Sequence, residues 1–286
     1  MTLLPFGIAA LIVLVVFISA LKNGVVRILA SGLSTCAAFI VLFGLINFLP
    51  SILQKTMNIA LNWQFLVGSA VVAAIVVYFI SVLIFGAVFR FLFRHGGFLH
   101  DCSDGIIGGL LSLFPSLLVV FFVFVCLRMT GTVMELNYVG SISQPNVQEA
   151  TNKFPAWPKL TVWRNQLESI PGAAPLFDAV DPFSRRENRN LAALLLMKQR
   201  VFLSNYLGTR DDSIDLLEDP AFEALMEDKI IFKKLENHDR IGLVMNSDLQ
   251  KAAKESSLRG NLRDWNLRDV VEDLIELLPN ASMKKQ

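Results

Sequence analysis

Four long stretches without an ionisable side chain constrain this sequence more than any other feature. Leu3–Leu21, Ile28–Gln54, Thr56–Phe89 and Gly105–Leu127 contain 19, 27, 34 and 23 residues without a charge. A helix of about 20 residues crosses the hydrocarbon core of a bilayer. Backbone groups in lipid must bond to one another, and a helix meets that requirement within one segment. The sequence therefore predicts four membrane-spanning helices.

The ends of these spans follow from the polar residues and prolines beside them. Pro50 is expected to end the second helix, and Trp63, among several amides, predicts an interfacial turn before the third. A cleaved signal peptide is the alternative for the first stretch. That stretch lacks a basic beginning, so we favour a span. The predicted spans are residues 3–21, 28–49, 65–89 and 105–127.

The charge distribution divides the sequence into two parts. Residues 1–131 carry six Lys or Arg and two Asp, whereas residues 132–286 carry 20 Lys or Arg and 23 Asp or Glu. Over the whole chain 53% of residues are apolar and 18% are charged, against about 25% charged in soluble domains. This pattern argues against a nucleic-acid binder, a disordered chain and a fully soluble enzyme. It predicts a bilayer-embedded part, residues 1–131, and a polar tail.

Basic residues in the short connections indicate an orientation. Lys22 and Arg27 lie between the first two spans, and Arg90 and Arg94 follow the third, whereas the opposite side has only Lys55 and Arg128. Short cytoplasmic loops carry an excess of Lys and Arg. We therefore expect a multi-pass protein with both ends of the chain and the whole tail outside the cytoplasm.

The fourth predicted span presents a face of small residues. Close backbone approach through such a face stabilises helix pairs in lipid. The face suits either a tight seam with another subunit, giving a homo-oligomer, or ordinary packing within the chain, which we favour. The predicted helix-packing residues are Gly105, Gly108, Gly109, Ser112 and Ser116, and Pro115 is expected to kink this helix.

Candidate chemistry is sparse. His95, His100, Cys102 and two aspartates lie in ten residues, but their spacing matches no established zinc pattern, so we favour a glycine turn followed by a capped helix. No ionisable residue lies at the centre of a span, which argues against a proton-coupled transporter. Neither a nucleophile motif nor a phosphate-binding loop occurs. We therefore expect no enzyme, no catalytic or metal-binding residue and no cofactor, and we leave a passive pore open.

Two short motifs resemble the colicin V production protein family, small four-span proteins of the bacterial inner membrane. The first runs from Lys22 to Arg27 and includes Gly24. The second, Asp104-Gly105-Ile106-Ile107-Gly108, resembles the family's entry into the last span, although Gly105 stands where the family has an arginine. The stretch from Trp163 to Pro175 is a weaker third likeness. The matched positions are Gly24, Arg27, Asp104 and Gly108, and the likeness covers about residues 1–180.

The resemblance implies an inner-membrane location and a role in toxin production, toxin export or envelope homeostasis, without a known biochemical activity. Some relatives carry an extracytoplasmic serine-protease domain after the same four spans. Such an architecture agrees with the orientation derived from charge, but the tail lacks the signals of a protease.

The tail divides at about residue 184. Residues 132–183 contain six prolines and predict a broken linker. Within it, Leu160–Ile170 predicts an amphipathic helix that lies on the bilayer surface or packs inside the protein. Residues 184–286 predict a soluble helical domain. A capping box at Ser184 predicts the start of its first helix, and Gly208 predicts the end of that helix. Asp219-Pro220 predicts another helix start, and Pro279 is expected to end the last helix.

These observations predict an all-α protein, with a four-helix transmembrane bundle, an extended linker and a small helical module. The favoured function is a non-enzymatic scaffold whose tail binds an envelope protein. The rival is an oligomeric pore, and an enzyme built on the loop from His95 to Asp104 is the weakest alternative. Nucleic acid is not an expected partner.

Overall fold

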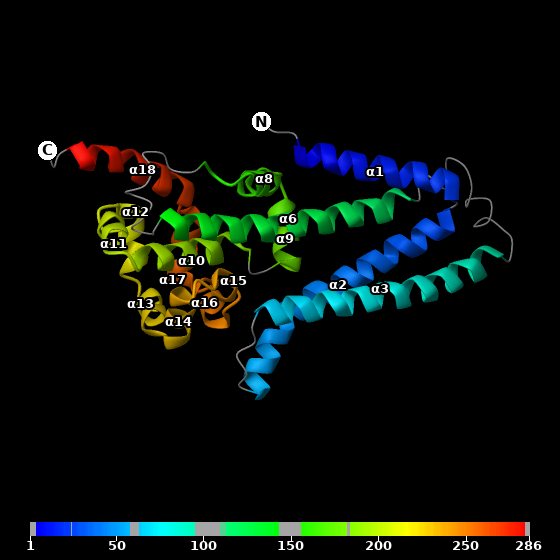
Figure 1. Cartoon of the computed structure of the whole chain (residues 1–286), viewed down its shortest axis with the longest axis horizontal. Coiled ribbons are helices and arrows are strands. Elements are labelled where there is room, and N and C mark those ends of the chain that lie inside the picture. Colours follow the sequence, from blue (N-terminus) through cyan, green and yellow to red (C-terminus); the bar gives the residue numbers. More distant parts are fainter. Residues whose placement is uncertain are drawn as a thin grey trace. The chain divides into compact units, whose positions relative to one another are not determined.

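The structure is a computed structural model, and it confirms the all-α class. It describes residues 4–23, 25–57, 63–94, 110, 112–142, 156–181 and 184–283, and every regular element in these ranges is a helix (Figure 1). The chain forms two compact units, Met1–Leu127 and Arg128–Gln286. Each unit is described separately below.

Three helices are long and apolar enough to cross a membrane. They are α2 (Val25–Met57), α3 (Trp63–Arg94) and α6 (Leu113–Ile142), with apolar segments at Ile28–Ile46, Gly68–Leu92 and Leu113–Ile142. The first predicted span, residues 3–21, corresponds to α1 (Leu4–Asn23), whose apolar segment Pro5–Ser19 is shorter. The length and apolar composition of α2, α3 and α6 indicate a membrane protein.

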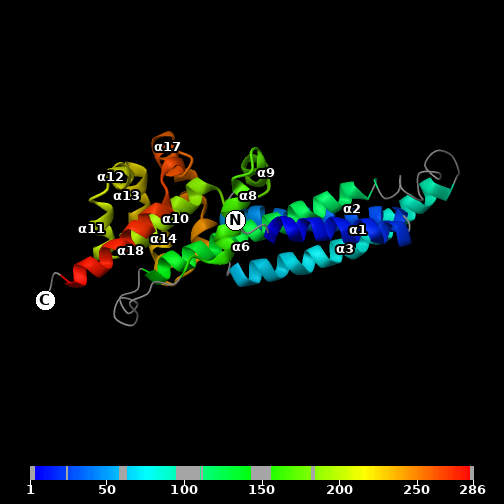
Figure 2. The same cartoon turned by 90° about the horizontal axis from the view of Figure 1, so that it is seen from above.

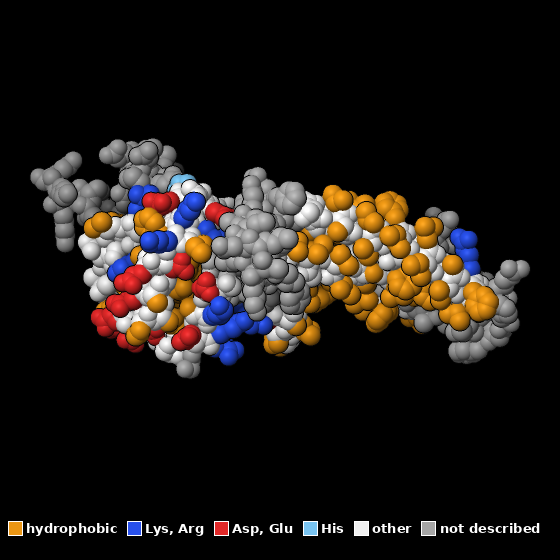
Figure 3. All heavy atoms as spheres, turned by 90° about the horizontal axis from the view of Figure 1, so that it is seen from below, with side chains coloured by type: hydrophobic (Ala, Val, Ile, Leu, Met, Phe, Trp, Pro, Cys, Tyr) orange, Lys and Arg blue, Asp and Glu red, His pale blue; other side chains and the backbone are white. Residues whose placement is uncertain are grey.

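The first unit exposes an apolar surface. Only 6% of the apolar segment of α3 is buried by neighbouring residues, and hydrophobic side chains cover the visible face of this unit (Figure 3). Leu83, for example, is 74% exposed. Contiguous apolar surface of this kind is unfavourable in water and suits lipid.

Helix α2 lies at the centre of the first unit, beside α1 and α3 (Figures 1 and 2). Small residues permit these approaches, and Ala30 and Ser34 of α2 and Ala70 of α3 are buried. Farther along α2, the ring of Phe39 stacks on Phe122 of α6, with ring centroids 4.7 Å apart. Small-residue contacts and stacked aromatics together hold the apolar helices.

Two prolines act differently from the prediction. Pro50 does not end the second span, because α2 continues through it to Met57, and the helix bends toward that end in Figure 1. A helix-interior proline removes one backbone bond and can bend a helix without stopping it. Pro115 lies in the first turn of α6, where its missing N–H leaves no bond unmade, so it starts this helix instead of kinking it.

Helix α6 also passes through the expected domain boundary at residue 131. Its first half belongs to the first unit, and its second half, Arg128–Ile142, belongs to the second. Leu136 and Val139 are buried there. The expected linker over residues 132–183 thus includes the end of α6 and two further helices, α8 (Lys159–Glu168) and α9 (Ala173–Val180).

The second unit is built around α10 (Arg186–Lys198). Every residue from Asn188 to Met197 is buried, which is typical of a core helix enclosed by its neighbours. The residues around it form α11 (Val201–Leu207), α12 (Asp211–Leu217), α13 (Pro220–Glu227), α14 (Lys229–Glu236), α15 (Arg240–Val244), α16 (Ser247–Ala252), α17 (Ser256–Asp264) and α18 (Leu267–Met283). The sequence predicts a helical module over residues 184–286, whereas the compact unit begins earlier, at Arg128.

Side-chain caps define four consecutive helix starts in this module. The side chains of Asp219, Asp228, Asp239 and Asn246 accept backbone N–H groups at the starts of α13 to α16. The predicted start at Asp219-Pro220 is confirmed, as is the stop at Gly208, the C-cap of α11.

Three other expectations for the module are wrong. Ser184 does not cap a helix, because α10 begins after Arg185 and its N-cap makes no side-chain bond. The helix expected to run through to Gly208 is interrupted at Gln199 and Arg200, which separate α10 from α11. Pro279 does not stop the last helix, which continues to Met283.

Candidate functional site

A polar stripe on the second half of α6 is the start of the main candidate site. Arg128, Thr132 and Glu135 follow one another at intervals of four and three residues, so they lie on one face of the helix. All three are buried. Buried charges need partners, and the partners here come from α8, α9 and α10.

Helix α8 approaches α6 closely at Gly131. A Cβ atom at that position would lie 2.9 Å from the carbonyl oxygen of Leu160, so only glycine fits. The hydroxyl of Thr161 donates to the Gly131 carbonyl at 3.1 Å. This approach places the guanidinium of Arg164 against the carboxylate of Glu135, with two N–O distances of 2.9 and 2.7 Å. The geometry is a bidentate, charge-assisted pair.

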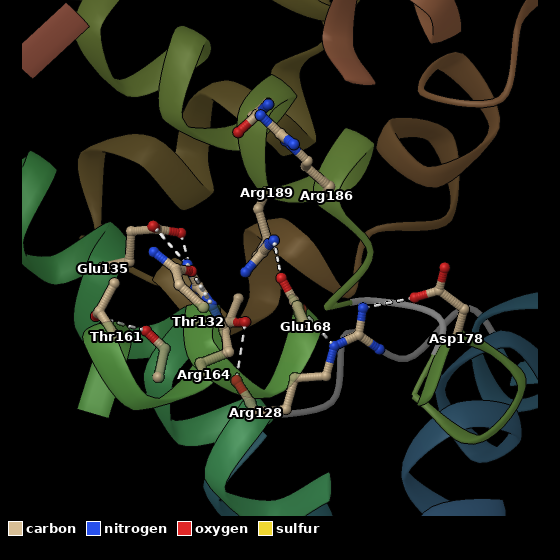
Figure 4. A network of polar contacts seen from close by, with 12 residues as sticks. Arg128, Thr132, Glu135, Thr161, Arg164, Glu168, Asp178, Arg186 and Arg189 are labelled. Carbon is tan, nitrogen blue, oxygen red and sulfur yellow. Dashed lines mark hydrogen bonds and ion pairs between the residues drawn. The ribbon is translucent and has the colours of Figure 1, made fainter. Parts of the chain in front are cut away.

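A second carboxylate, Glu168, joins two arginines. Arg128 Nε donates to one oxygen of Glu168 at 2.7 Å, and Arg189 Nη2 donates to the other at 2.8 Å (Figure 4). Arg128 Nη2 also contacts Asp178 Oδ1 of α9 at 2.5 Å, and its Nη1 donates to the Asp181 carbonyl at 3.3 Å. We call these residues of α6, α8, α9 and α10 the buried ion network.

The surroundings of the network shift the pKa values of two carboxyl groups in opposite directions. Burial alone would raise the pKa of Glu168, but the positive charges of Arg189, Arg164 and Arg128 outweigh it and lower that pKa to about 2. Burial raises the pKa of Asp181 to about 6, although bonds from Ser184 and the charges of Arg128 and Arg189 oppose this shift. Glu168 is therefore ionised at neutral pH, whereas Asp181 titrates just below it.

These acidities predict a stability maximum in mildly acidic solution. Asp181 binds its proton more tightly in the folded state, so the stability falls as pH rises from its ordinary pKa of 3.8 through about 6. Glu168 acts in the opposite sense, and its contribution is lost as pH falls from its ordinary pKa of 4.5 toward 2. Replacing Asp181 with Asn should remove the decline below pH 7 and raise the free energy of unfolding at pH 7 by about 2–3 kcal/mol.

Urea unfolding of the full chain between pH 3 and pH 8 measures this effect. The Asp248→Asn variant is the control, because the Asp248 side chain is 43% exposed in a surface ion pair and should leave the pH profile unchanged. An unaltered profile for Asp181→Asn would contradict the assignment of the slope to Asp181.

Two cavities adjoin the network within the second unit. The larger has a volume of about 680 Å³ and is lined by Arg128, Glu168 and Asp178, with Lys254, Arg259 and Arg263 among its other residues. The smaller, of about 270 Å³, is lined by Glu135, Arg164, Glu168 and Arg189 together with residues of α10 and α18. Both cavities are rich in arginine, which suits anionic ligands.

Most residues singled out by the sequence lie outside the described ranges. These are Gly24, Asp104, Gly105, Gly108, Gly109 and the loop from His95 to Asp104. Arg27 lies in α2, and Ser112 and Ser116 are buried in the first unit. Among the described residues, no group of three His, Cys, Asp or Glu side chains could hold a metal ion. His238 is exposed and has a left-handed backbone, with φ of 56°.

The sequence interpretation missed the buried ion network. It treated Arg128 as the end of a span and the residues after it as a linker. The spacing of Arg128, Thr132 and Glu135 was the available signal, because it marks one polar helix face directly after an apolar stretch. For Leu160–Ile170, burial of Arg164 and Leu167 supports the packing alternative over the surface one.

Comparisons of the chain with family models, with curated proteins and with solved structures found no match. The class of protein therefore follows from the described helices themselves. It is a helical membrane protein in which one apolar helix, α6, continues as a buried helix of a charged helical module.

Proposed function

We propose that this chain is a non-enzymatic scaffold of the bacterial inner membrane, of the colicin V production type, whose helical module binds an envelope protein. In this proposal α1, α2, α3 and α6 are the four spans of a transmembrane bundle, and both ends of the chain lie outside the cytoplasm. The role is in toxin production or export, or in envelope homeostasis.

The observation that carries the proposal is the continuity of α6. One helix supplies apolar surface in the first unit and buried side chains, such as Leu136, in the second. Three of its charged or polar side chains form hydrogen bonds within the second unit: Arg128, Thr132 and Glu135. A membrane helix that is tied in this way suits an anchor for a folded binding module. The resemblance to the colicin V production family rests on the motifs around Gly24 and Asp104.

Paired reporter fusions after Gln286 test the orientation on which this proposal depends. A reporter active only outside the cytoplasm is expected to work, and one active only inside is expected to fail, because Lys22, Arg27, Arg90 and Arg94 mark the cytoplasmic loops. The same pair fused before Met1 should give the same result if α1 crosses the bilayer. Activity of the internal reporter after Gln286 would contradict an envelope partner.

A passive oligomeric pore is the second candidate, and one observation favours it. A cavity of about 220 Å³ in the first unit is lined by hydroxyl residues, among them Ser19, Ser31, Thr35 and Ser116. Two of these hydroxyls donate to carbonyls of their own helices: Thr35 Oγ1 to Ser31 at 2.9 Å and Ser116 Oγ to Leu113 at 2.7 Å. Release of a trapped dye from liposomes containing the purified chain would favour the pore over the scaffold.

A further inference from the structure

The smaller cavity of the second unit has a charged floor and a polar opening. Its floor includes Glu135, Arg164, Arg189 and Asn190, which are buried. Its opening includes the exposed residues Asn165, Ser169, Asn266 and Arg268. A volume of about 270 Å³ is near the lower limit for sites of small ligands. The cavity thus suits a small polar molecule that enters from solvent.

The two carboxylates that line the cavity, Glu135 and Glu168, are already bonded to arginines. Both oxygens of Glu135 accept from Arg164, and the two oxygens of Glu168 accept from Arg128 and Arg189. Charge-assisted pairs of this geometry satisfy the carboxylate oxygens and leave little negative potential to repel an anion. Arg186 and Arg268 add two further cations to the lining.

Arg189 supplies the donors that the network does not use. Its side chain is only 4% exposed, and one nitrogen, Nη2, binds Glu168. Its Nε and Nη1 are buried and have no hydrogen-bond partner among the residues that the structure describes. An unmade bond of a buried cation is costly, and burial together with the charges of Arg164 and Arg128 lowers the pKa of Arg189. Neither nitrogen is exposed to solvent, so an anion in the cavity would relieve both effects through a small shift of the guanidinium toward it.

We propose that this cavity binds a phosphate-type oxyanion, with the free nitrogens of Arg189 as donors and Arg186 and Arg268 as additional cations. Guanidinium groups match the oxygens of phosphate in geometry and in charge. The larger cavity differs in its most buried cation, because Arg128 has an acceptor for each of its three nitrogens, although the buried Nε of Arg185 in its lining has no partner among the described residues. The ligand is a free phosphate compound or the headgroup of a phospholipid.

Thermal unfolding of the purified full chain tests the site. Potassium phosphate should raise the melting temperature above that in potassium chloride of equal ionic strength. Arg268→Gln should raise the apparent dissociation constant for phosphate about fivefold, as expected for one exposed charge. Its melting temperature without phosphate should be unchanged, because Arg268 makes only an exposed ion pair with Glu272. Arg189→Lys keeps the charge and removes donors, so its effect should exceed tenfold.

Arg259→Gln is the matched control. Arg259 is also an exposed arginine, with 62% of its side chain accessible, but it lines the larger cavity. It should respond to phosphate as the unaltered chain does. If Arg189→Lys does not fold, the phosphate response of Arg268→Gln compared with that of Arg259→Gln still tests whether phosphate binds in the smaller cavity.

Nanodiscs distinguish the two sources of the oxyanion. Discs of phosphatidylcholine with and without phosphatidylglycerol replace free phosphate in the same measurement. Stabilisation by phosphatidylglycerol that is weakened by Arg268→Gln and not by Arg259→Gln identifies a lipid headgroup and supports the site. If neither probe stabilises the chain, or if the unaltered chain and both glutamine variants respond equally, the proposal is wrong.

Discussion

Replacing Arg164 with methionine is expected to lower the free energy of unfolding by about 3–5 kcal/mol, a large part of the stability of a typical domain. The reason is the carboxylate that the substitution leaves behind. Glu135 is 8% exposed at its side chain and accepts both of its strong bonds from Arg164. Without that cation it must stay charged and buried or take up a proton. Urea unfolding of the full chain at pH 7 measures the loss.

Two further variants separate the charge effect from a loss of packing. Glu135→Leu combined with Arg164→Met removes both charges, so this double variant should recover most of the lost stability. Lys251→Met breaks the exposed pair with Asp248 and should cost less than about 1 kcal/mol. If Arg164→Met costs no more than Lys251→Met, the network does not stabilise the module.

Replacing Gly32 with alanine is the second substitution with a large expected effect. A Cβ atom at Gly32 would lie 2.2 Å from the Cβ atom of Pro115, far inside van der Waals contact. The proline ring is rigid, so α2 and α6 must move apart in the first unit. Overpacking of this kind costs about 1–3 kcal/mol or more. The melting temperature of the purified chain in detergent should therefore fall by several degrees.

Gly44 provides the matched control on the same helix. A Cβ atom there meets no atom within 4 Å, and alanine favours helix over glycine, so Gly44→Ala should leave the melting temperature unchanged or raise it. Combining Gly32→Ala with Pro115→Gly removes the atom that clashes and should restore part of the loss. Equal melting temperatures for Gly32→Ala and Gly44→Ala would rule out a tight contact at Gly32.

The apolar helices could be predicted from the sequence because the bilayer imposes one simple requirement. A stretch such as Thr56–Phe89 has no charge, and a single segment in lipid can satisfy its own backbone hydrogen bonds only as a helix. Helix ends were harder to place. The rule that proline ends a helix was wrong at Pro50 and Pro279, where the helix continues. The rule that proline starts a helix was right at Pro220, where the missing N–H falls in the first turn. Tertiary packing decides which of these outcomes occurs.

The buried ion network could not be predicted from local pattern. Arg128 contacts Glu168 and Asp178, which follow it by 40 and 50 residues, and Arg164 contacts Glu135 across 29 residues. Periodicity marks a polar face but does not name its partner. The six prolines of residues 132–183 also suggested a broken chain, whereas Pro158 and Pro171 simply flank α8.

The network also has a consequence for the order of synthesis. Arg128 leaves the ribosome 40 residues ahead of Glu168, and Glu135 leaves it 29 residues ahead of Arg164. While α6 enters the membrane machinery, its second half therefore carries charges whose partners have not yet been made. An unpaired arginine resists entry into lipid. In the proposed orientation Arg128 must thus cross the bilayer unpaired, and the later arrival of α8 and α10 converts the same residue into part of a folded core.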